Sequence, residues 1–424
     1  MVWILTFVAA ATAGLRGELS ATGAYHVADA ASGNVLMRGA DVAVYMDGAW
    51  HVGGVNLTAV GASNVSGVDR VFGPYTGTRV EWRTASSVAV VFATSLLNFA
   101  DAIVFETAYP EGAARTAHAN AAASGKHGVI ANFPAMRTLA PKLGGALSWA
   151  GEFIAASRKR TYGLSGGPTV FYDDPRAGVK GSTVLIGAPL DHFKCTGETD
   201  RLWDGSAGAW VPGTAATVQS LPRGFTHRFT LQMGAPGGGV TSALHAWGEQ
   251  LRTRFNTTRV ADPTLSALSY TTDNGAQLCF CTEDCDAKLI AVRDALVARG
   301  APTLGAVSWQ GGWWKNPKIH TPLCAPWCVS SWEANATKNP MGVAALDAAL
   351  GGIPLQLYAP YFCADTAYDK RNGGKYDFVD ADTTIDGCGG YTFRTPSPDD
   401  AAVRRASESR RPGRAGALLR RRCE

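Results

Sequence analysis

The chain has 424 residues, of which 46% are hydrophobic and 17% charged, so two or three domains with a large core are expected and global disorder is excluded. The formal net charge is +4, but the last 21 residues carry eight arginines and two glutamates, a local charge of +6 that leaves about −2 for the rest. Because the basic excess is one terminal run and not a folded face, nucleic-acid binding is excluded as a function class.

The N-terminal residues 1–13 are predicted to be a secretory signal peptide. The apolar stretch Val2–Ala11 is too short to span a bilayer, and Ala11-Thr12-Ala13 supplies the small residues that signal peptidase needs. A buried first strand is the alternative interpretation. No later apolar run approaches the length of a transmembrane helix, so we expect a secreted or secretory-pathway protein without stable membrane insertion.

Secretion agrees with the potential glycosylation sites and with the cysteine content. Eight of the nine cysteines lie between Cys195 and Cys388, and disulfide bonds are the default interpretation in an oxidising compartment. Four sequons predict N-glycosylation. Their asparagines are Asn56, Asn64, Asn256 and Asn335.

Residues 20–235 are predicted to form a β-sandwich with many strands. Short runs rich in Val, Tyr, Phe and Thr are separated by glycine-bearing turns at intervals typical of such a fold. The runs include "DVAVYMDGAW", "TRVEWRT", "SVAVVFATS", "AIVFETAYP", "PTVFYDD" and "STVLIGAPL".

Residues 236–262 are predicted to form a glycine-rich hinge and a linker helix. The stretch "MGAPGGGV" (233–240) supplies the glycines. In the following stretch, 241–255, Leu244, Trp247 and Leu251 recur at intervals of three and four, which indicates a helix with one apolar face.

Residues 263–403 alternate between strand and helix patterns, which indicates a parallel sheet. The predicted strands are 264–272, 302–310 and 353–362. The predicted helices are 284–300, 339–352 and a third that begins with Ser397 as N-cap and Pro398 in its first turn.

A β-sandwich followed by β/α units predicts a (β/α)8 barrel of the TIM type, here incomplete. Such a barrel takes about 250 residues, whereas about 160 follow Thr264 and supply three strands. The Arg-rich residues 404–424 are predicted to be a disordered tail, and their low-complexity composition interrupts the third helix. We therefore expect the chain to be a truncated or mis-spliced version of a longer protein.

Three stretches should lie where such barrels bind ligands, at the carboxyl ends of the strands. They are "TTDNGAQ" (271–277), "SWQGGWWKN" (308–316) and "YAPYFCAD" (358–365). Tryptophan and tyrosine offer flat apolar faces to a sugar ring, while Asp, Asn, Gln and Lys can hydrogen-bond its hydroxyls. The predicted substrate-binding residues are Asp273, Asn274, Gln310, Trp313, Trp314, Lys315, Tyr358, Tyr361 and Asp365.

Each of these residues also has a structural interpretation. The tryptophans would equally suit a barrel core, and Asp273 and Asp365 would suit turns or helix caps. The cluster Cys279, Cys281 and Cys285 lacks the paired spacing and nearby histidines of a structural zinc site, so disulfides are favoured over a metal. We expect no metal and no cofactor.

The motifs "LSYTTDNGA", "SWQGGWWKN" and "PLQLYAPYF", behind a β-rich domain and a helix with "WGEQL", resemble secreted glycoside hydrolase-like proteins of algae and protists. Those proteins are related to the clan of α-galactosidases, raffinose synthases and α-glucosidases. The resemblance covers roughly residues 20–400. It implies a retaining mechanism on an O-glycosyl bond, with two carboxylates about 5 Å apart on the fourth and sixth barrel strands.

This chain stops before both of those strands, so the catalytic residues are unknown and the chain is expected to be inactive alone. Gln310-Gly311-Gly312-Trp313 also lacks the paired aspartates that α-galactosidases have there. The expected partner is an oligosaccharide or glycoside. The alternatives are a non-catalytic extracellular carbohydrate-binding protein and a structural extracellular β-domain with a decayed C-terminal half.

Overall fold

The structure is a computed structural model that describes two compact units, one up to Thr258 and one from Arg259 onward. The described residues are 14–118, 128–139, 143–148, 155–156, 163–164, 167–173, 183–272, 281, 283–301, 304–309, 313–315, 328–357, 361–380, 393–397 and 400–401. The predicted signal peptide and the arginine-rich tail lie outside these residues.

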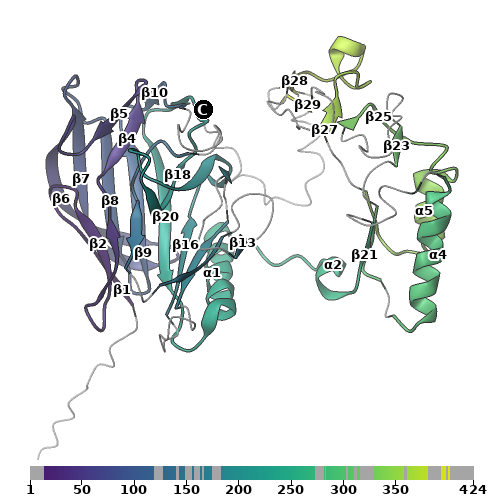
Figure 1. Ribbon diagram of the computed structural model, residues 1–424, viewed down its shortest axis with the longest axis horizontal. Helices are drawn as coiled ribbons and strands as arrows, with labels where there is room; N and C mark the ends of the chain where they lie inside the picture. Colours follow the sequence, from purple (N-terminus) through teal and green to yellow (C-terminus); the bar gives the residue numbers. More distant parts are fainter. Residues whose placement is uncertain are drawn as a thin grey trace, which may run out of the picture. The chain divides into compact units, whose positions relative to one another are not determined.

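The first unit contains two large antiparallel sheets (Figure 1). The seven-stranded sheet has the order β1 (Leu15–Leu19), β2 (Tyr25–Asp29), β3 (Val35–Gly39), β11 (Met136–Thr138), β18 (Ala207–Thr214), β17 (Thr196–Arg201) and β14 (Gly163–Leu164). The nine-stranded sheet has the order β13 (Ala155–Ala156), β12 (Gly145–Ser148), β15 (Thr169–Tyr172), β16 (Val184–Pro189), β20 (Phe225–Met233), β9 (Ala102–Tyr109), β8 (Phe92–Asn98), β7 (Gly73–Thr84) and β6 (Leu57–Asp69).

Smaller elements complete the first unit. Two ribbons pair β4 (Ala43–Met46) with β5 (Ala49–Val52), and β10 (Ala113–Ala114) with β19 (Ser220–Leu221). The predicted strand "DVAVYMDGAW" is therefore a hairpin, because Asp47 and Gly48 both adopt positive φ and turn the chain. A short 3-10 helix, η2 (Phe193–Cys195), precedes β17.

The two large sheets pack face to face around one core, which makes the first unit a β-sandwich. Alternate residues of the strands point inward, as the pleat requires. The seven-stranded sheet contributes Leu15, Tyr25, Val27, Met37, Met136 and Trp210, and the nine-stranded sheet contributes Trp82, Phe92, Leu96, Ile103, Phe105, Phe171, Leu185 and Leu231.

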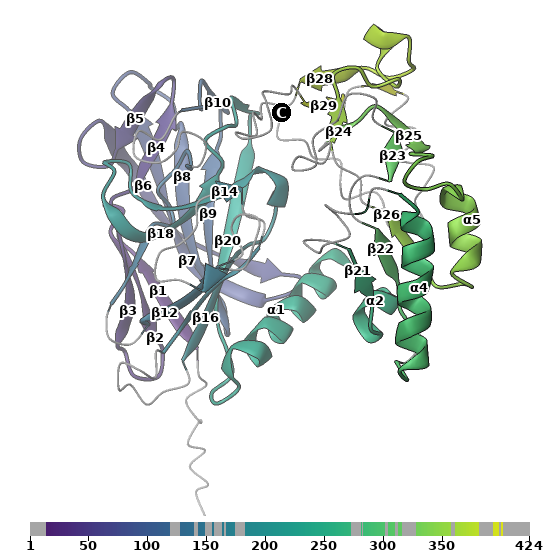
Figure 2. The ribbon, with the colours of Figure 1, turned by 45° about the vertical axis from the view of Figure 1, so that its right-hand side comes forward.

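The helix α1 (Gly239–Phe255) packs on the outer face of the nine-stranded sheet (Figure 2). Ala243 is buried with Val184 and Ile186 of β16, and Leu244 and Trp247 pack against the same cluster. The apolar periodicity of this segment thus has a structural reason, and the helix belongs to the first compact unit.

A carboxylate fastens the end of α1 to the β6–β7 turn. Asp69 accepts hydrogen bonds from the N–H groups of Val71 (2.8 Å) and Phe72 (3.1 Å), and it pairs with Arg254 at 3.1 Å. Arg70 donates to the carbonyls of Thr253 and Arg254. Partial burial alone would raise the pKa of Asp69, but these hydrogen bonds and Arg254 hold it below its usual value.

We expect Asp69→Ala to lower the free energy of unfolding by about 2 kcal/mol, because a charged group with several hydrogen bonds is lost. Urea unfolding and hydrogen exchange at the end of α1 would measure this. The control is Glu111→Ala, which removes an exposed ion pair with Arg223 and should change stability by less than about 1 kcal/mol. Equal effects of the two substitutions would contradict the role given to Asp69.

The second unit begins with α2 (Pro263–Ser266), where the predicted strand 264–272 is wrong for its first half. Asp262 accepts a hydrogen bond from the N–H of Thr264 at 2.8 Å, and Pro263 occupies the first helical turn. This N-cap starts a helical turn before the strand β21 (Tyr270–Thr271).

Three parallel strands follow in sequential order, β21, β22 (Val307–Trp309) and β26 (Leu355–Leu357). They alternate with α4 (Cys285–Ala298) and α5 (Gly342–Ala349). Both helices cover the same face of this sheet, because Leu289 and Leu346 share one apolar cluster with Val307 and Trp309 (Figure 2). Asp286 joins the helices by accepting the N–H of Met341 at 2.9 Å.

Two small sheets lie beyond the parallel strands. A ribbon pairs β23 (Trp314–Lys315) with β25 (Ser331–Ala334). The predicted strand 353–362 is divided, since its end forms β27 in a separate sheet. That sheet has the order β24 (Cys328–Val329), β27 (Tyr361–Cys363), β29 (Phe393–Pro396) and β28 (Phe378–Asp380), with the 3-10 helix η3 (Lys370–Asn372) between β27 and β28.

Candidate saccharide site beyond the parallel strands

The candidate site is built from segments that follow β22 and β26. Trp313 and Trp314 come after β22, and Asp365 comes after β27. Lys315 and Tyr361 are described by their backbone, in β23 and β27. Asp273, Asn274, Gln310 and Tyr358 lie outside the described residues.

Trp313 and Trp314 are buried, with exposed fractions of 4% and 1%. Their rings meet edge to face at 5.8 Å and belong to the apolar cluster beneath α4 and α5. The carbonyl of Trp313 accepts hydrogen bonds from the backbone N–H of Asn335 (2.8 Å) and the side-chain amide of Asn339 (3.0 Å). Of the two interpretations given to these rings, the core one describes their packing in this structure.

Trp332 is a partly exposed indole of this region, as Phe362 and Tyr368 are partly exposed rings, and no sequence pattern distinguished it. Its indole stacks on Trp313 with ring centroids 5.4 Å apart and an interplanar angle of 26°. It also meets Phe362 edge to face at 5.7 Å. A half-buried indole supported from below by a second indole is a rigid surface for an apolar ligand face.

Polar groups lie beside Trp332 because segments 330–332 and 365–368 are hydrogen-bonded together. Ser330 donates its hydroxyl to Asp365 at 3.0 Å, and the N–H of Trp332 donates to the Tyr368 hydroxyl at 2.8 Å. The carbonyl of Ser330 accepts from the Ala367 N–H at 2.9 Å and from the Thr366 hydroxyl at 3.2 Å. These hydrogen bonds join the Asp365 carboxylate to the segment that carries Trp332.

A buried ion-pair network fixes the ends of these segments. Asp369 is 1% exposed and pairs with Arg371 at 2.9 Å and with Arg394 at 2.7 Å. Burial alone would raise the pKa of Asp369, but the two guanidinium groups and the Arg371 N–H lower it below its usual value. This network ties η3 to β29 and gives the Asp365–Tyr368 turn a fixed position.

The cysteines at the start of α4 form a disulfide bond. Cys281 and Cys285 are bonded to each other, with their Cα atoms 5.8 Å apart. Cys195 of the first unit and Cys363 of the second each take part in a separate disulfide bond. In the described part of the chain, no three His, Cys, Asp or Glu side chains are grouped as metal ligands, and no helix is long and apolar enough to cross a membrane.

The sequons differ in how their asparagines are held. Asn64 and Asn256 are exposed, on β6 and directly after α1. Asn56 uses its amide in hydrogen bonds with the Val52 N–H (2.7 Å) and the Trp50 carbonyl (3.1 Å). Asn335 accepts from the N–H of Thr337 at 3.1 Å within its own turn.

No family model matches the chain, and a search of curated proteins found no match. Among solved structures, the chain is similar to the alpha-N-acetylgalactosaminidase NagBb from Bifidobacterium bifidum, with 9% identity, a TM-score of 0.48, and coverage of 90% of this chain and 64% of that one. It is also similar to a Glycoside Hydrolase Family 97 enzyme from Pseudoalteromonas sp., with 8% identity, a TM-score of 0.40, and coverage of 81% and 52%.

An alpha-mannosidase from Enterococcus faecalis is similar at 9% identity and a TM-score of 0.29, over 57% of this chain and 30% of that one. All three structural neighbours are glycoside hydrolases. The chain spans less than two thirds of the length of each.

Proposed function

We propose that the chain is a secreted carbohydrate-active protein related to retaining α-glycosidases, and that its second unit is the first part of a (β/α)8 barrel. The arrangement of β21, β22 and β26 supports the barrel part of the proposal, because the wall of such a barrel consists of sequential parallel strands with their helices on one face. Thr271, Ser308 and Gln356 are in register on the opposite face, which would line the barrel interior.

The observation that carries the proposal is that hydrogen bonds join the Trp332 segment to the Asp365–Tyr368 turn: Ser330 donates to Asp365, and the Trp332 N–H donates to Tyr368. A pyranose can lay its C–H face on an indole while a carboxylate accepts hydrogen bonds from its hydroxyls. Trp313 supports Trp332 from below, and Ser330 orients Asp365. We extend the site to Asp273, Asn274, Gln310, Lys315, Tyr358 and Tyr361, which the sequence places on the same strand ends.

Hydrolysis requires carboxylates in addition to a sugar-binding surface. Retaining hydrolysis needs two carboxylates about 5 Å apart. In the described part of the second unit, Asp365 is held by Ser330, while Asp369 is committed to two arginines. The second candidate is a carbohydrate-binding protein without hydrolytic activity, for which Trp332 would supply the binding surface.

Secretion is part of the proposal. The Cys281–Cys285 disulfide suits an oxidising compartment, and exposed Asn64 and Asn256 suit N-linked glycans. Secretion, glycosylation and a substrate with an α-linked sugar are therefore proposed together.

We expect Trp332→Ala to weaken binding of a neutral α-galactoside or α-glucoside oligosaccharide by at least about tenfold, because the stacking surface is removed. Calorimetric titration of the full chain measures this. Trp50→Ala, which removes another partly buried indole in the first unit, should leave the affinity unchanged. Equal affinities of the wild type and Trp332→Ala would remove Trp332 from the site.

A further inference from the structure

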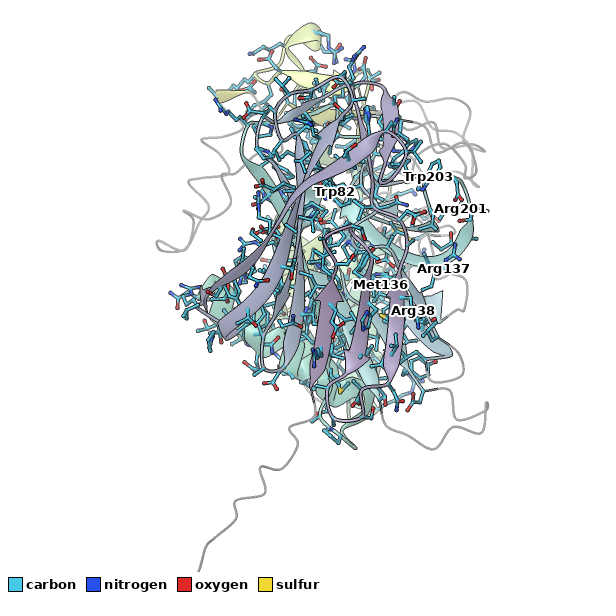
Figure 3. The ribbon with its side chains drawn as sticks, turned by 90° about the vertical axis from the view of Figure 1, so that its left-hand side faces the viewer. Arg38, Trp82, Met136, Arg137, Arg201 and Trp203 are labelled. Atoms are coloured by element: carbon cyan, nitrogen blue, oxygen red, sulfur yellow. A yellow bond between two sulfur atoms is a disulfide. The ribbon has the colours of Figure 1, made fainter. Side chains whose placement is uncertain are left out.

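Two arginines lie directly opposite each other on the outer face of the seven-stranded sheet. Arg137 of β11 pairs in register with Arg38 of β3, and His26 of β2 is the next residue in the same row. The neighbouring residues Met37 and Met136 point into the core, so Arg38 and Arg137 point outward and are exposed (Figure 3). Three groups that can carry positive charge therefore occupy one row across three adjacent strands.

Neither arginine of this row forms an ion pair with a carboxylate in the part of the chain that the structure describes. The side chain of Arg38 has no hydrogen-bond partner there, and Arg137 donates to the Ser206 hydroxyl at 3.3 Å. Glu18, at the end of the row, pairs with Arg16 at 3.1 Å and lies 3.7 Å from His26. Like charges directly opposite each other in a sheet are destabilising, so an anion between the arginines would relieve their repulsion.

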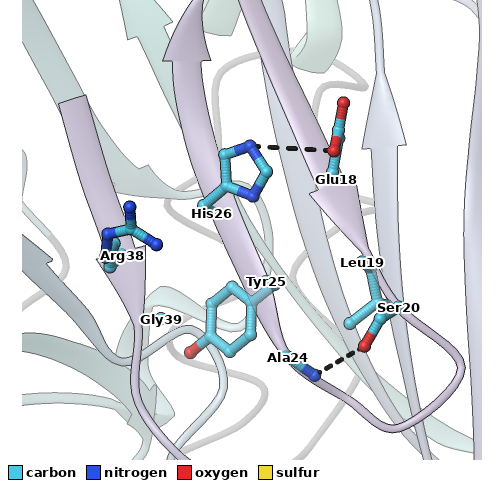
Figure 4. A pocket seen from close by; sticks show the side chains of 8 residues that line it. All are labelled: Glu18, Leu19, Ser20, Ala24, Tyr25, His26, Arg38 and Gly39. Atoms are coloured by element: carbon cyan, nitrogen blue, oxygen red, sulfur yellow. Dashed lines mark hydrogen bonds and ion pairs between the residues drawn. The ribbon is translucent and has the colours of Figure 1, made fainter. Parts of the chain in front are cut away.

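A hollow of about 390 Å³ adjoins the row. It is lined by Glu18, Leu19, Ser20, Ala24, Tyr25, His26, Arg38 and Gly39, and Figure 4 shows Glu18 paired with His26. A surface depression beside the Arg38 side chain provides room for a ligand that extends beyond a single anionic group.

The β17–β18 loop supplies an aromatic ring on the other side of Arg137. The Ser206 hydroxyl that Arg137 contacts belongs to this loop, which is closed by the hydrogen bond from the Leu202 N–H to the Ser206 carbonyl at 2.8 Å. Trp203 is half-buried in the loop, on the side of the sheet where Figure 3 labels Arg137 and Arg38. Asp204, also in this loop, has its pKa lowered mainly by hydrogen bonds from Ser206 and in part by Arg137.

We propose that this surface binds an acidic saccharide, whose carboxylate or sulfate group lies between Arg38 and Arg137. A guanidinium group recognises either oxyanion by a pair of parallel hydrogen bonds. The Trp203 ring would receive the apolar face of a neighbouring sugar. Nucleic acid fits less well, because the row holds only two arginines, whereas phosphate-backbone binding commonly uses six or more contacts.

The test is calorimetric titration of the full chain with oligogalacturonate, sulfated dextran, neutral dextran, inorganic sulfate and a single-stranded DNA oligonucleotide. We expect binding of at least one acidic saccharide, an affinity loss of about tenfold in Arg38→Gln and in Arg137→Gln, and a smaller loss in Arg38→Lys. The matched control Arg223→Gln removes one exposed arginine elsewhere in the same unit and should bind normally. Melting curves of each variant confirm that it folds.

Oligogalacturonate and sulfated dextran distinguish a carboxylate ligand from a sulfate ligand, and binding of either supports the inference. It is overturned if neither saccharide binds, if DNA binds more tightly, if inorganic sulfate competes with equal affinity, or if Arg223→Gln loses as much as Arg38→Gln. The site belongs to the first unit, so this result is independent of neutral-sugar binding at Trp332.

Discussion

Lowering the pH from 7 to 4 is expected to reduce the free energy of unfolding by roughly 3 kcal/mol through His227 alone. His227 of β20 is fully buried between Thr214 and Thr196, whose hydroxyl oxygens lie 2.9 Å from Nδ1 and 3.2 Å from Nε2. Burial lowers its pKa from 6.5 to about 4, because the charged imidazolium cannot be solvated there. Asp191 opposes this shift and His192 adds to it.

The direction follows from proton binding. Between pH 6.5 and about 4, the unfolded chain binds a proton at this histidine and the folded chain does not, so stability is lost as the pH falls through this window. His227→Gln keeps a donor and an acceptor for the two threonines but cannot titrate in this range. The measurement is urea unfolding of both proteins from pH 7 to pH 4, followed by hydrogen exchange of β9 and β20. A constant difference between them at all pH values would rule out a buried neutral histidine.

Trp210→Ala is expected to destabilise the first unit by about 3–5 kcal/mol, because it empties a large site in the core. Trp210 of β18 is 1% exposed and crosses the interface between the two sheets. Its ring lies against Gly187 of β16, where an added Cβ would come within 2.3 Å, and it meets Phe171 of β15 edge to face at 5.7 Å. A glycine therefore makes room for the indole in the opposite sheet.

This contact gives a sharper test than a single substitution. Gly187→Ala should cost about 1–3 kcal/mol because the methyl group overlaps Trp210, and this cost should largely disappear in the Trp210→Ala background. Gly61→Ala in β6 is the matched control, since its added Cβ would meet only Glu81 at 3.8 Å. Additive effects of Gly187→Ala and Trp210→Ala in urea unfolding would contradict the packing described here.

The alternation of apolar residues made much of the fold predictable. The helix with Leu244 and Trp247 on one face is present as α1, and those two side chains pack on the sandwich. The turn at Asp262-Pro263 carries an equally clear N-cap signal, so α2 occupies residues that the pattern 264–272 predicted as the start of a strand. Local capping chemistry decides such a boundary more strongly than strand propensity does.

The candidate site was less predictable, because the exposure of its tryptophan side chains depends on pairing between strands that are distant in the sequence. Trp314 of β23 pairs with Ala334 of β25, 20 residues further along the chain, and both tryptophan rings share one apolar cluster with α4 and α5. Trp332 lies in β25 itself and gave no separate sequence signal. The cross-strand pair of Arg38 and Arg137 is separated by about a hundred residues, so only the strand register brings these charges together.

Glycan binding by the full chain tests the central claim most directly. The wild-type protein, Trp332→Ala, Trp50→Ala and Arg38→Gln would be applied to one array that holds neutral α-galactosides, neutral α-glucosides and acidic saccharides. A carbohydrate-active protein with a sugar site at Trp332 should bind neutral α-glycosides, lose that binding in Trp332→Ala, and keep it in Trp50→Ala and Arg38→Gln. An array on which the folded wild-type protein binds no neutral α-glycoside would contradict the proposed function.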